Sequence, residues 1–297
     1  DVITFYILFK KDPKIFIVKQ FIKNGYVIAD LKIEFDELGN IKNNYKLNGL
    51  IKEGQLSLSK KYDFNKINFL FEINEKELKF NDIKLSLNKK NIFLPELTAL
   101  KKNNEYTISG KLNNQDTKLD KKDLKDFIIK QSIDLDIQEI ILSSKNYFEF
   151  KIDKSLKITD LKINSEIDIA KLRLKNSFKL KNIFPKIKKD ILFENHNIKF
   201  EYNENNLNLM GQGEVFLQNK IDKINYEIYK KKDEFNFNTT LTILENPFQL
   251  ELLNYKKKDN TDLELNFKGK NKIKEKLIFD EISLKEKDNI ISIKNLI

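Results

Sequence analysis

Few residues in this sequence could do acid–base or metal chemistry, and His196 is the only histidine. It stands in the stretch ENHNIKFEY, at the start of a run that is typical of a strand. A metal site or a nucleophile–base pair needs further His, Cys or acidic side chains at matched spacing, and His196 has no partner at such spacing. We therefore interpret His196 as a polar residue at a strand edge.

The stretch MGQGE, from Met210 to Glu214, is the nearest approach to a glycine-rich phosphate loop. Such a loop joins a strand to a helix, so that backbone N–H groups surround the phosphate. Here the apolar alternation continues through the stretch and no helical pattern follows it. Gly211 and Gly213 are in register with Leu209 and Val215, so we expect them on the apolar side of a strand, where they leave room for a neighbour.

Acidic residues form two groups that resemble paired carboxylates. Asp120, Asp123 and Asp126 lie on one face of a predicted helix, and Asp134 and Asp136 alternate with apolar residues in IDLDI. Both patterns are typical of solvated surface. We therefore predict no catalytic residue, no metal site and no cofactor, and we expect that the chain is not an enzyme.

The formal net charge of +10 and the pI near 9.2 would ordinarily suggest nucleic acid or an anionic membrane surface as a partner. Arg173 is the only arginine, however, and the bidentate reading of phosphates or bases favours arginine. We therefore predict no nucleic-acid partner. The clusters Lys230–Lys232 and Lys256–Lys258 fall at the ends of predicted strands, where lysine protects sheet edges and is also suited to anionic head groups.

Alternation of apolar and polar residues dominates the chain, with Asn, Asp, Gly and Lys clusters between the runs. One apolar face and one polar face on each run predict antiparallel strands with one wet side. The clearest predicted strands are Ile67–Ile73, Tyr106–Leu112, Leu161–Ile169, Leu172–Leu180, Leu207–Leu217, Phe235–Ile243 and Leu263–Phe267.

Turn signals agree with this pattern. FDELGNIK, from Phe35 to Lys42, places Gly39 and Asn40 between two alternating runs, as a short hairpin loop with a positive φ requires. At Asn81 and Asp82 the alternation slips by one residue, which predicts a β-bulge.

Two short helices are predicted, over Asp120–Gln131 and Pro13–Asn24, and a weaker one over FPKIKKDIL near Phe184. They are too few to cover the apolar faces of so many strands. The first helix is the best internal boundary, so we divide the chain into residues 1–131 and residues 132–297, two parts of one continuous sheet. With Pro and Gly at only 4 and 8, no flexible linker is indicated.

The fold that we predict is mainly β, an elongated, twisted antiparallel sheet that curls into an apolar groove. A row of eight to ten residues spans about 26–34 Å, close to the hydrophobic length of a phospholipid or somewhat more. No segment reaches the roughly 18–20 apolar residues of a membrane span. The predicted groove-lining residues are Ile67, Phe69, Phe71, Ile73, Ile83, Leu85, Leu87, Ile163, Ile167, Leu172, Leu174, Phe178, Leu207, Leu209, Val215, Phe235, Phe237, Leu241, Leu263, Leu265 and Phe267.

Two long stretches, Phe35–Leu97 and Phe184–Tyr255, resemble the AsmA-like proteins of the YhdP type. The first begins FDELGNIKNNYKLNGL and follows the order strand, GN turn, strand, short strand, long strand pair. The second begins FPKIKKDILFENHNIKFEY and looks like the later strands of the same family. Together they cover a little under half of the chain. They are patterns of alternation and contain no catalytic signature.

The resemblance implies a periplasmic protein, anchored in the inner membrane by a segment outside these residues, that conducts phospholipids toward the outer membrane along a hydrophobic β-groove. Its partners would be phospholipid acyl chains, and charge at Phe69 should impair their passage more than charge at Asn68. The alternative is a closed β-sandwich or solenoid with a structural or adhesive role in the envelope. Alternation leaves both open, because a protein core and a lipid groove need the same apolar residues.

Overall fold

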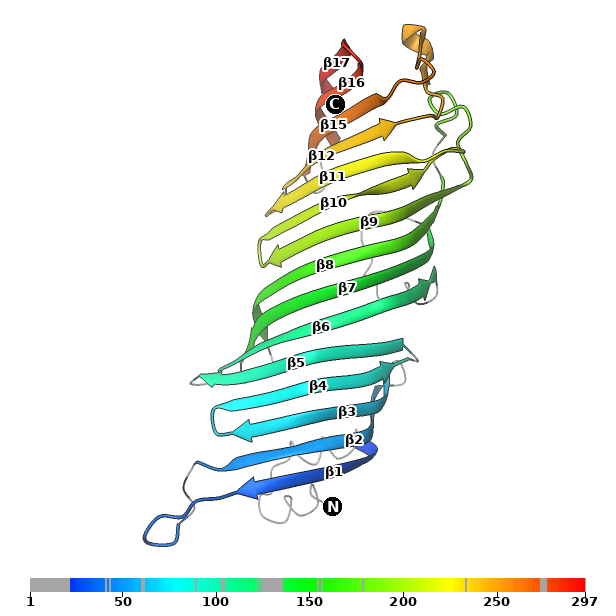
Figure 1. The fold of residues 1–297 in the computed structure, drawn as a ribbon. Coiled ribbons are helices and arrows are strands. Elements are labelled where there is room, and N and C mark those ends of the chain that lie inside the picture. The colour runs from blue at the N-terminus through cyan, green and yellow to red at the C-terminus, as the bar shows by residue number, and fades with distance from the viewer. Residues whose placement is uncertain are drawn as a thin grey trace. The chain divides into compact units, whose positions relative to one another are not determined.

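The structure is a computed structural model that describes residues 22–40, 42, 44–59, 62–88, 90–102, 105–121, 123, 136–153, 155, 157–177, 179–232, 234–272 and 277–296. Nearly all described segments are strands (Figure 1). The strands are β1 (Ile22–Lys32), β2 (Lys46–Ser59), β3 (Tyr62–Asn74), β4 (Glu77–Leu87), β5 (Lys90–Lys102), β6 (Glu105–Asp120), β7 (Ile137–Ile152), β8 (Ile158–Lys175), β9 (Asp190–Asn203), β10 (Asn206–Phe216), β11 (Asp222–Lys231), β12 (Glu234–Ile243), β13 (Gln249–Leu250), β14 (Tyr255–Lys256), β15 (Leu263–Lys272), β16 (Leu277–Glu286) and β17 (Asn289–Leu296).

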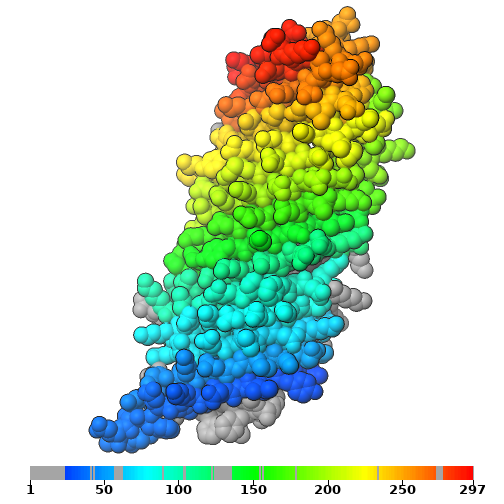
Figure 2. All heavy atoms as spheres, in the orientation of Figure 1, coloured from blue at the N-terminus to red at the C-terminus, as the bar shows by residue number. Residues whose placement is uncertain are grey.

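Fifteen of these strands form one antiparallel sheet in which neighbours in sequence are neighbours in space. Its order is β1 to β12, then β15, β16 and β17, and Figure 2 shows the same succession as bands of colour. The strands β13 and β14 form a separate two-stranded sheet in the excursion between β12 and β15. The sheet is open, with β1 and β17 as its edge strands. The predicted class, mainly β and antiparallel, is confirmed.

The chain forms two compact units, and β6, β7 and β8 contribute to both. The first unit contains residues 1–114 and 145–161, and the second contains residues 115–144 and 162–297.

Bulges keep the apolar side chains on one face. Lys66, Asp82 and Asn195 have φ values of 52°, within strands β3, β4 and β9 respectively. In β4, Phe80 lies opposite Phe71 before the bulge and Ile83 lies opposite Leu94 after it. The predicted bulge at Asn81 and Asp82 is confirmed, and it explains why the alternation slips without ending the strand.

One strand prediction was wrong. Leu161–Ile169 and Leu172–Leu180 were separated in the prediction, but β8 runs without a break from Ile158 to Lys175. Leu172 pairs with Phe193, next to the bulge at Asn195, so the apparent gap is a second change of phase within one strand. Lys179 and Leu180 lie beyond the strand.

The predicted turn after β1 is confirmed. Gly39 has a φ of 79°, and its N–H donates to the carbonyl of Asp36 at 3.0 Å. The Asp36 carboxylate also accepts the N–H groups of Leu38 and Asn40. Such an arrangement is how Asp stabilises a tight turn, and the hydrogen bonds from Asn40 and Leu38 lower the pKa of this carboxyl against the opposing effect of desolvation.

Little of the predicted helical structure falls in the described residues. At Asp120 the side chain accepts the N–H of Asp123 at 2.9 Å, as an N-cap does, but residues 124–131 lie outside the described part. Of the candidate over Pro13–Asn24, only Ile22–Asn24 are described, and they belong to β1. The weak candidate near Phe184 is a series of turns. Among the described residues, no helix is long and apolar enough to cross a membrane.

Candidate functional site: the apolar face of the sheet

In the first unit, the predicted apolar row forms one face of β3 and β4. Phe71 lies opposite Phe80, and Ile73 lies opposite Leu78. The ring of Phe69 packs edge-to-face on Phe80, with ring centroids 5.6 Å apart. Among the predicted lining residues, Phe71 and Ile83 are buried, whereas those that remain partly exposed are Ile67, Phe69, Ile73, Leu85 and Leu87.

Asn68, on the opposite face of β3, has a structural role that the sequence did not reveal. Its Oδ1 accepts the N–H of Glu53 at 3.1 Å, and its Nδ2 donates to the carbonyl of Lys66 at 2.7 Å. Both partners are bulge residues with positive φ. A substitution at Asn68 would therefore disturb the backbone, so this residue is a poor polar-face control for Phe69.

In the second unit, the apolar face continues strand by strand. Leu209 lies opposite Phe200 in β9 and Ile228 in β11, and Ile228 lies opposite Phe237 in β12. The register places the described lining residues predicted for this unit on this one face: Ile163, Ile167, Leu172, Leu174, Leu207, Leu209, Val215, Phe235, Phe237, Leu241, Leu263, Leu265 and Phe267. Phe178 lies outside the described residues.

The prediction missed the contributions of β9 and β11. Phe200 and Ile228 come from runs that alternate as regularly as the others, NIKFEY and KINYEIY, so the signal was present. Tyr226 also points to the apolar face, where its ring covers Gly211. These residues fill the places between the predicted rows.

His196 is part of the apolar face and not a strand-edge residue, which corrects the prediction. Only 3% of its surface is exposed. Its ring lies edge-on to Phe193 at 5.3 Å and stacks near Tyr226 at 6.2 Å. It occupies the space above Gly213, which confirms that the glycines of MGQGE leave room for neighbouring side chains.

The surroundings of His196 favour the neutral form of its ring. Nε2 lies 3.0 Å from the carbonyl oxygen of Glu214, which can only accept, so Nε2 carries the hydrogen. Burial lowers the pKa of the imidazole, and the hydrogen bond to Glu214 opposes this only in part. A buried neutral ring between aromatic neighbours is a packing element.

At one end of the second unit, the apolar face is covered by two segments that we call the cap, residues 179–189 and residues 244–262. Phe184 and Phe248 come from the two segments and contact each other edge-to-face at 5.6 Å. Both are buried in one cluster with sheet residues that include Val215, Ile243 and Leu263. Four predicted lining residues, Val215, Leu241, Leu263 and Leu265, therefore belong to a protein core at this end.

Buried polar side chains fix the cap in place. Gln218 accepts the N–H of Lys186 at 2.9 Å and donates to the carbonyl of Pro247 at 2.8 Å, so it joins the two segments. The Asn246 amide donates to Asp222 at 2.8 Å. Burial raises the pKa of Asp222, and the hydrogen bonds that it accepts from Asn246 and the Leu244 N–H oppose this rise.

Glu286, at the end of β16, is the third anchor. Its carboxylate, 3% exposed, accepts the Tyr255 hydroxyl at 2.9 Å, the Lys258 N–H at 2.8 Å and the Thr261 hydroxyl at 2.6 Å. Burial alone would raise the pKa of Glu286, but the three hydrogen bonds outweigh burial and lower it. Burial and the bond to Glu286 raise the pKa of the Tyr255 phenol.

The other end of the same strands lacks such a cover in the described part of the chain. Four apolar or aromatic residues lie at or near this end and are partly exposed: Tyr202, Leu207, Phe235 and Phe279. No member of the buried cluster falls there among the described residues. Among the described residues, the apolar face of this unit is thus filled by protein at one end and partly exposed at the other.

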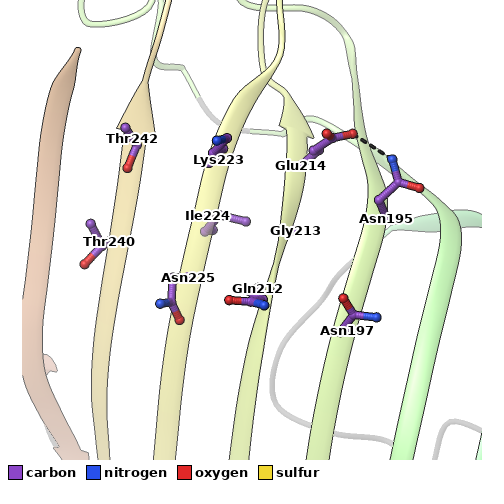
Figure 3. A pocket seen from close by; sticks show the side chains of 10 residues that line it. All are labelled: Asn195, Asn197, Gln212, Gly213, Glu214, Lys223, Ile224, Asn225, Thr240 and Thr242. Carbon is purple, nitrogen blue, oxygen red and sulfur yellow. Dashed lines mark hydrogen bonds between the residues drawn. The ribbon is translucent and has the colours of Figure 1, made fainter.

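The opposite face of the second unit is polar and contains a hollow of about 390 Å³ (Figure 3). Amide, hydroxyl and charged side chains from β9 to β12 surround it, as Asn197, Gln212, Asn225 and Thr240 show in the figure. Glu214 accepts the Asn195 amide at 2.8 Å. The residue types are those of a hydrated surface, in contrast to the apolar face behind it.

Three of the acidic residues considered as paired carboxylates are described, and they contact a lysine or backbone N–H groups. Asp136 accepts Lys121 at 2.6 Å, and this hydrogen bond lowers the pKa of the Asp136 carboxyl. Asp126 and Asp134 lie outside the described residues. Arg173 lies 3.7 Å from Glu139, which also pairs with Lys118 at 2.6 Å.

No protein-family model, curated protein or solved structure matches this chain.

Proposed function

We propose that this chain is a segment of an AsmA-like envelope protein of the YhdP type that conducts phospholipids between the inner and outer membranes. The acyl chains lie on the apolar face of the sheet, and the polar face meets water. The proposal places the chain in the periplasm, with its inner-membrane anchor outside these residues. Lysines on the polar face provide solvation and no nucleic-acid site.

The observation that carries the proposal is the partly exposed apolar face outside the cap. A water-soluble sheet normally buries such a face, and a large accessible apolar surface usually marks a ligand or a membrane. The eight strands β8–β12 and β15–β17 extend about 34 Å across the second unit, at about 4.8 Å per strand. One leaflet of a bilayer contributes about 15 Å of hydrocarbon, so the face is long enough for a whole acyl chain.

At the capped end of the second unit, the structure favours the alternative function, a closed structural domain. Where Phe184 and Phe248 cover Val215 and Leu263, the apolar face is a closed protein core, as in a structural β-domain. We therefore limit the proposed lipid contacts in the second unit to residues outside that core, such as Leu209, Ile228 and Phe237.

Lipid analysis of a matched pair of variants tests the proposal. Ile228→Glu places a charge on the apolar face, and Asn225→Glu places the same charge on the exposed polar face of the same strand. Phospholipid that copurifies from cells should be lost from the Ile228 variant and retained by the Asn225 variant, as measured by mass spectrometry. Circular dichroism of both variants controls for unfolding.

A folded wild-type protein without lipid would contradict the proposal and favour the closed structural domain. Equal loss of lipid from two folded variants would also contradict it, because the two faces would then not differ.

A further inference from the structure

The cap ends in a tip that exposes two leucines to solvent. β13 and β14 form a hairpin around a short 3-10 helix, Glu251–Leu253. Leu252 is 101% exposed and Leu253 is 52% exposed. Asn254 adopts the left-handed conformation, with a φ of 46°, and its N–H donates to the carbonyl of Glu251 at 3.0 Å. The turn therefore closes on itself and directs the leucines outward.

The base of this hairpin is firmly attached, so the exposure of its tip does not come from a loose loop. Phe248 is 3% exposed and packs edge-to-face on Tyr255 at 6.3 Å. Tyr255 bonds Glu286, and the N–H of Lys257 donates to the carbonyl of Phe248 at 2.9 Å. Leu252 is fully exposed and Leu253 half exposed at the end of a fixed hairpin, so their position requires an explanation other than packing within the described chain.

The cap that carries this tip is rich in lysine. The adjoining cap segment, residues 179–189, contains five lysines, all exposed, and no acidic residue. It lies next to the hairpin, because the N–H of Gln249 donates to the carbonyl of Ile183 at 3.1 Å. In the other cap segment, the three lysines Lys256–Lys258 balance the charge of three acidic residues, Glu251, Asp259 and Asp262. The fourth acidic residue, Glu245, pairs with Lys220 at 3.4 Å. The cap as a whole is therefore positively charged.

We propose that the cap binds the surface of an anionic phospholipid bilayer, with Leu252 and Leu253 inserted at the boundary between head groups and acyl chains. Apolar side chains beside a basic surface are the combination by which proteins attach to anionic membranes. Lysine is depleted in protein–protein interfaces, where arginine and aromatic residues are enriched, so the lysine-rich surroundings favour a lipid surface over a protein partner. The attachment goes beyond lipid conduction and does not require lipid on the apolar face.

A single tryptophan reports the insertion, because the chain contains none. Leu252→Trp places the reporter at the tip, and Tyr229→Trp places it on the polar face of β11. With vesicles of equal parts phosphatidylglycerol and phosphatidylcholine, the emission of the Leu252 variant should shift to the blue while that of the Tyr229 variant stays unchanged. Vesicles of phosphatidylcholine alone should shift neither.

Cosedimentation with the same anionic vesicles measures the binding. Leu252→Asp should weaken the binding about tenfold. A tenfold loss of affinity corresponds to slightly less free energy than the full burial of one leucine side chain provides. Lys186→Glu should also weaken the binding, because it reverses one charge of the basic surface. Added salt should release the wild-type protein. Phe237→Glu, on the apolar face, should leave vesicle binding unchanged even if it abolishes lipid carriage, which separates the two proposals.

The absence of vesicle binding by the wild-type chain would overturn the proposal. Equal binding by wild type and Leu252→Asp, or a blue shift of the Tyr229 reporter alone, would overturn it as well.

Discussion

The imidazole of His196 lies directly above Gly213 on the neighbouring strand, so that a Cβ at position 213 would come within 2.2 Å of His196 Cδ2. Gly211 stands in the same relation to Tyr226, because a Cβ at position 211 would come within 2.4 Å of the Tyr226 ring. Two glycines thus admit two rings into the apolar face.

Gly213→Ala should destabilise the protein by about 1–3 kcal/mol, because the rigid and buried ring cannot move aside without disturbing its neighbours. Urea denaturation of the wild type and the variant measures the difference. In a His196→Ala background, the same Gly213→Ala change should cost much less, since the ring is gone and the methyl group fills part of its space. Equal costs in both backgrounds would show that the ring contact is not the cause.

Acid should weaken the fold through His196. Its folded-state pKa is lowered from 6.5 by burial, so the unfolded chain binds a proton more readily than the folded chain. The contribution to stability is complete above about pH 6.5 and is lost as the pH falls from there toward the folded pKa. Urea titrations between pH 7 and the acid range should show this decline.

His196→Gln should remove this component of the pH dependence. Asp222 acts in the opposite direction, because its raised pKa favours the folded state at low pH, and it is present in both proteins. As the chain has one histidine, its ring protons in an NMR titration report the pKa directly. An ordinary value near 6.5 would contradict the packing described here.

Glu286→Gln should loosen the cap. The substitution removes the charge that receives three hydrogen bonds, and one amide oxygen cannot replace two carboxylate oxygens, so we expect a loss of about 1.5–3 kcal/mol. Hydrogen exchange should rise across residues 244–262 and stay unchanged in β9. Lys285→Gln, at the exposed neighbouring position, serves as the control.

Protonation of Glu286 should have a similar effect. Its pKa is lowered in the folded state, so the stabilisation is present above about pH 4.5 and is lost as the pH falls through the folded pKa. Equal hydrogen exchange across the cap in the wild type and in Glu286→Gln would contradict this role of Glu286. It would show that Gln218 and Asp222 are sufficient anchors.

The bulge in β4 depends on the left-handed conformation of Asp82. Asp82→Ile should cost about 1–2 kcal/mol, because a β-branched residue is strained at a φ of 52°. Asp82→Gly should be tolerated, and Lys84→Ile, two residues along on the same strand, should cost less than Asp82→Ile. Thermal denaturation of the three variants gives the order. The reverse order would mean that side-chain contacts and not the backbone fix the bulge.

Alternation was sufficient to predict the sheet and most of its apolar face, because each strand has one wet side. It placed Phe69 and Phe237 correctly on that face without any knowledge of their partners. It divided β8 in two between Ile169 and Leu172, because the phase of the alternation changes there while the strand and its pairing with β9 continue. A local pattern contains no information about the neighbouring strand.

The cap and His196 were missed for a related reason. Phe184 and Phe248 lie in turns without periodicity, and they become core residues only because segments far apart in sequence meet. The partner that explains the buried position of His196 is Gly213 on the next strand. Such long-range contacts decide which part of the apolar face is closed and which part is accessible.

Site-specific photocrosslinking in cells would decide whether acyl chains contact the accessible part of the apolar face. A benzophenone side chain at Phe237 faces the proposed lipid path, and the same group at Asn238 faces water from the next position in β12. We predict phospholipid adducts at position 237 and none at position 238. Adducts at neither position, or equally at both, would contradict lipid carriage and favour a closed structural sheet.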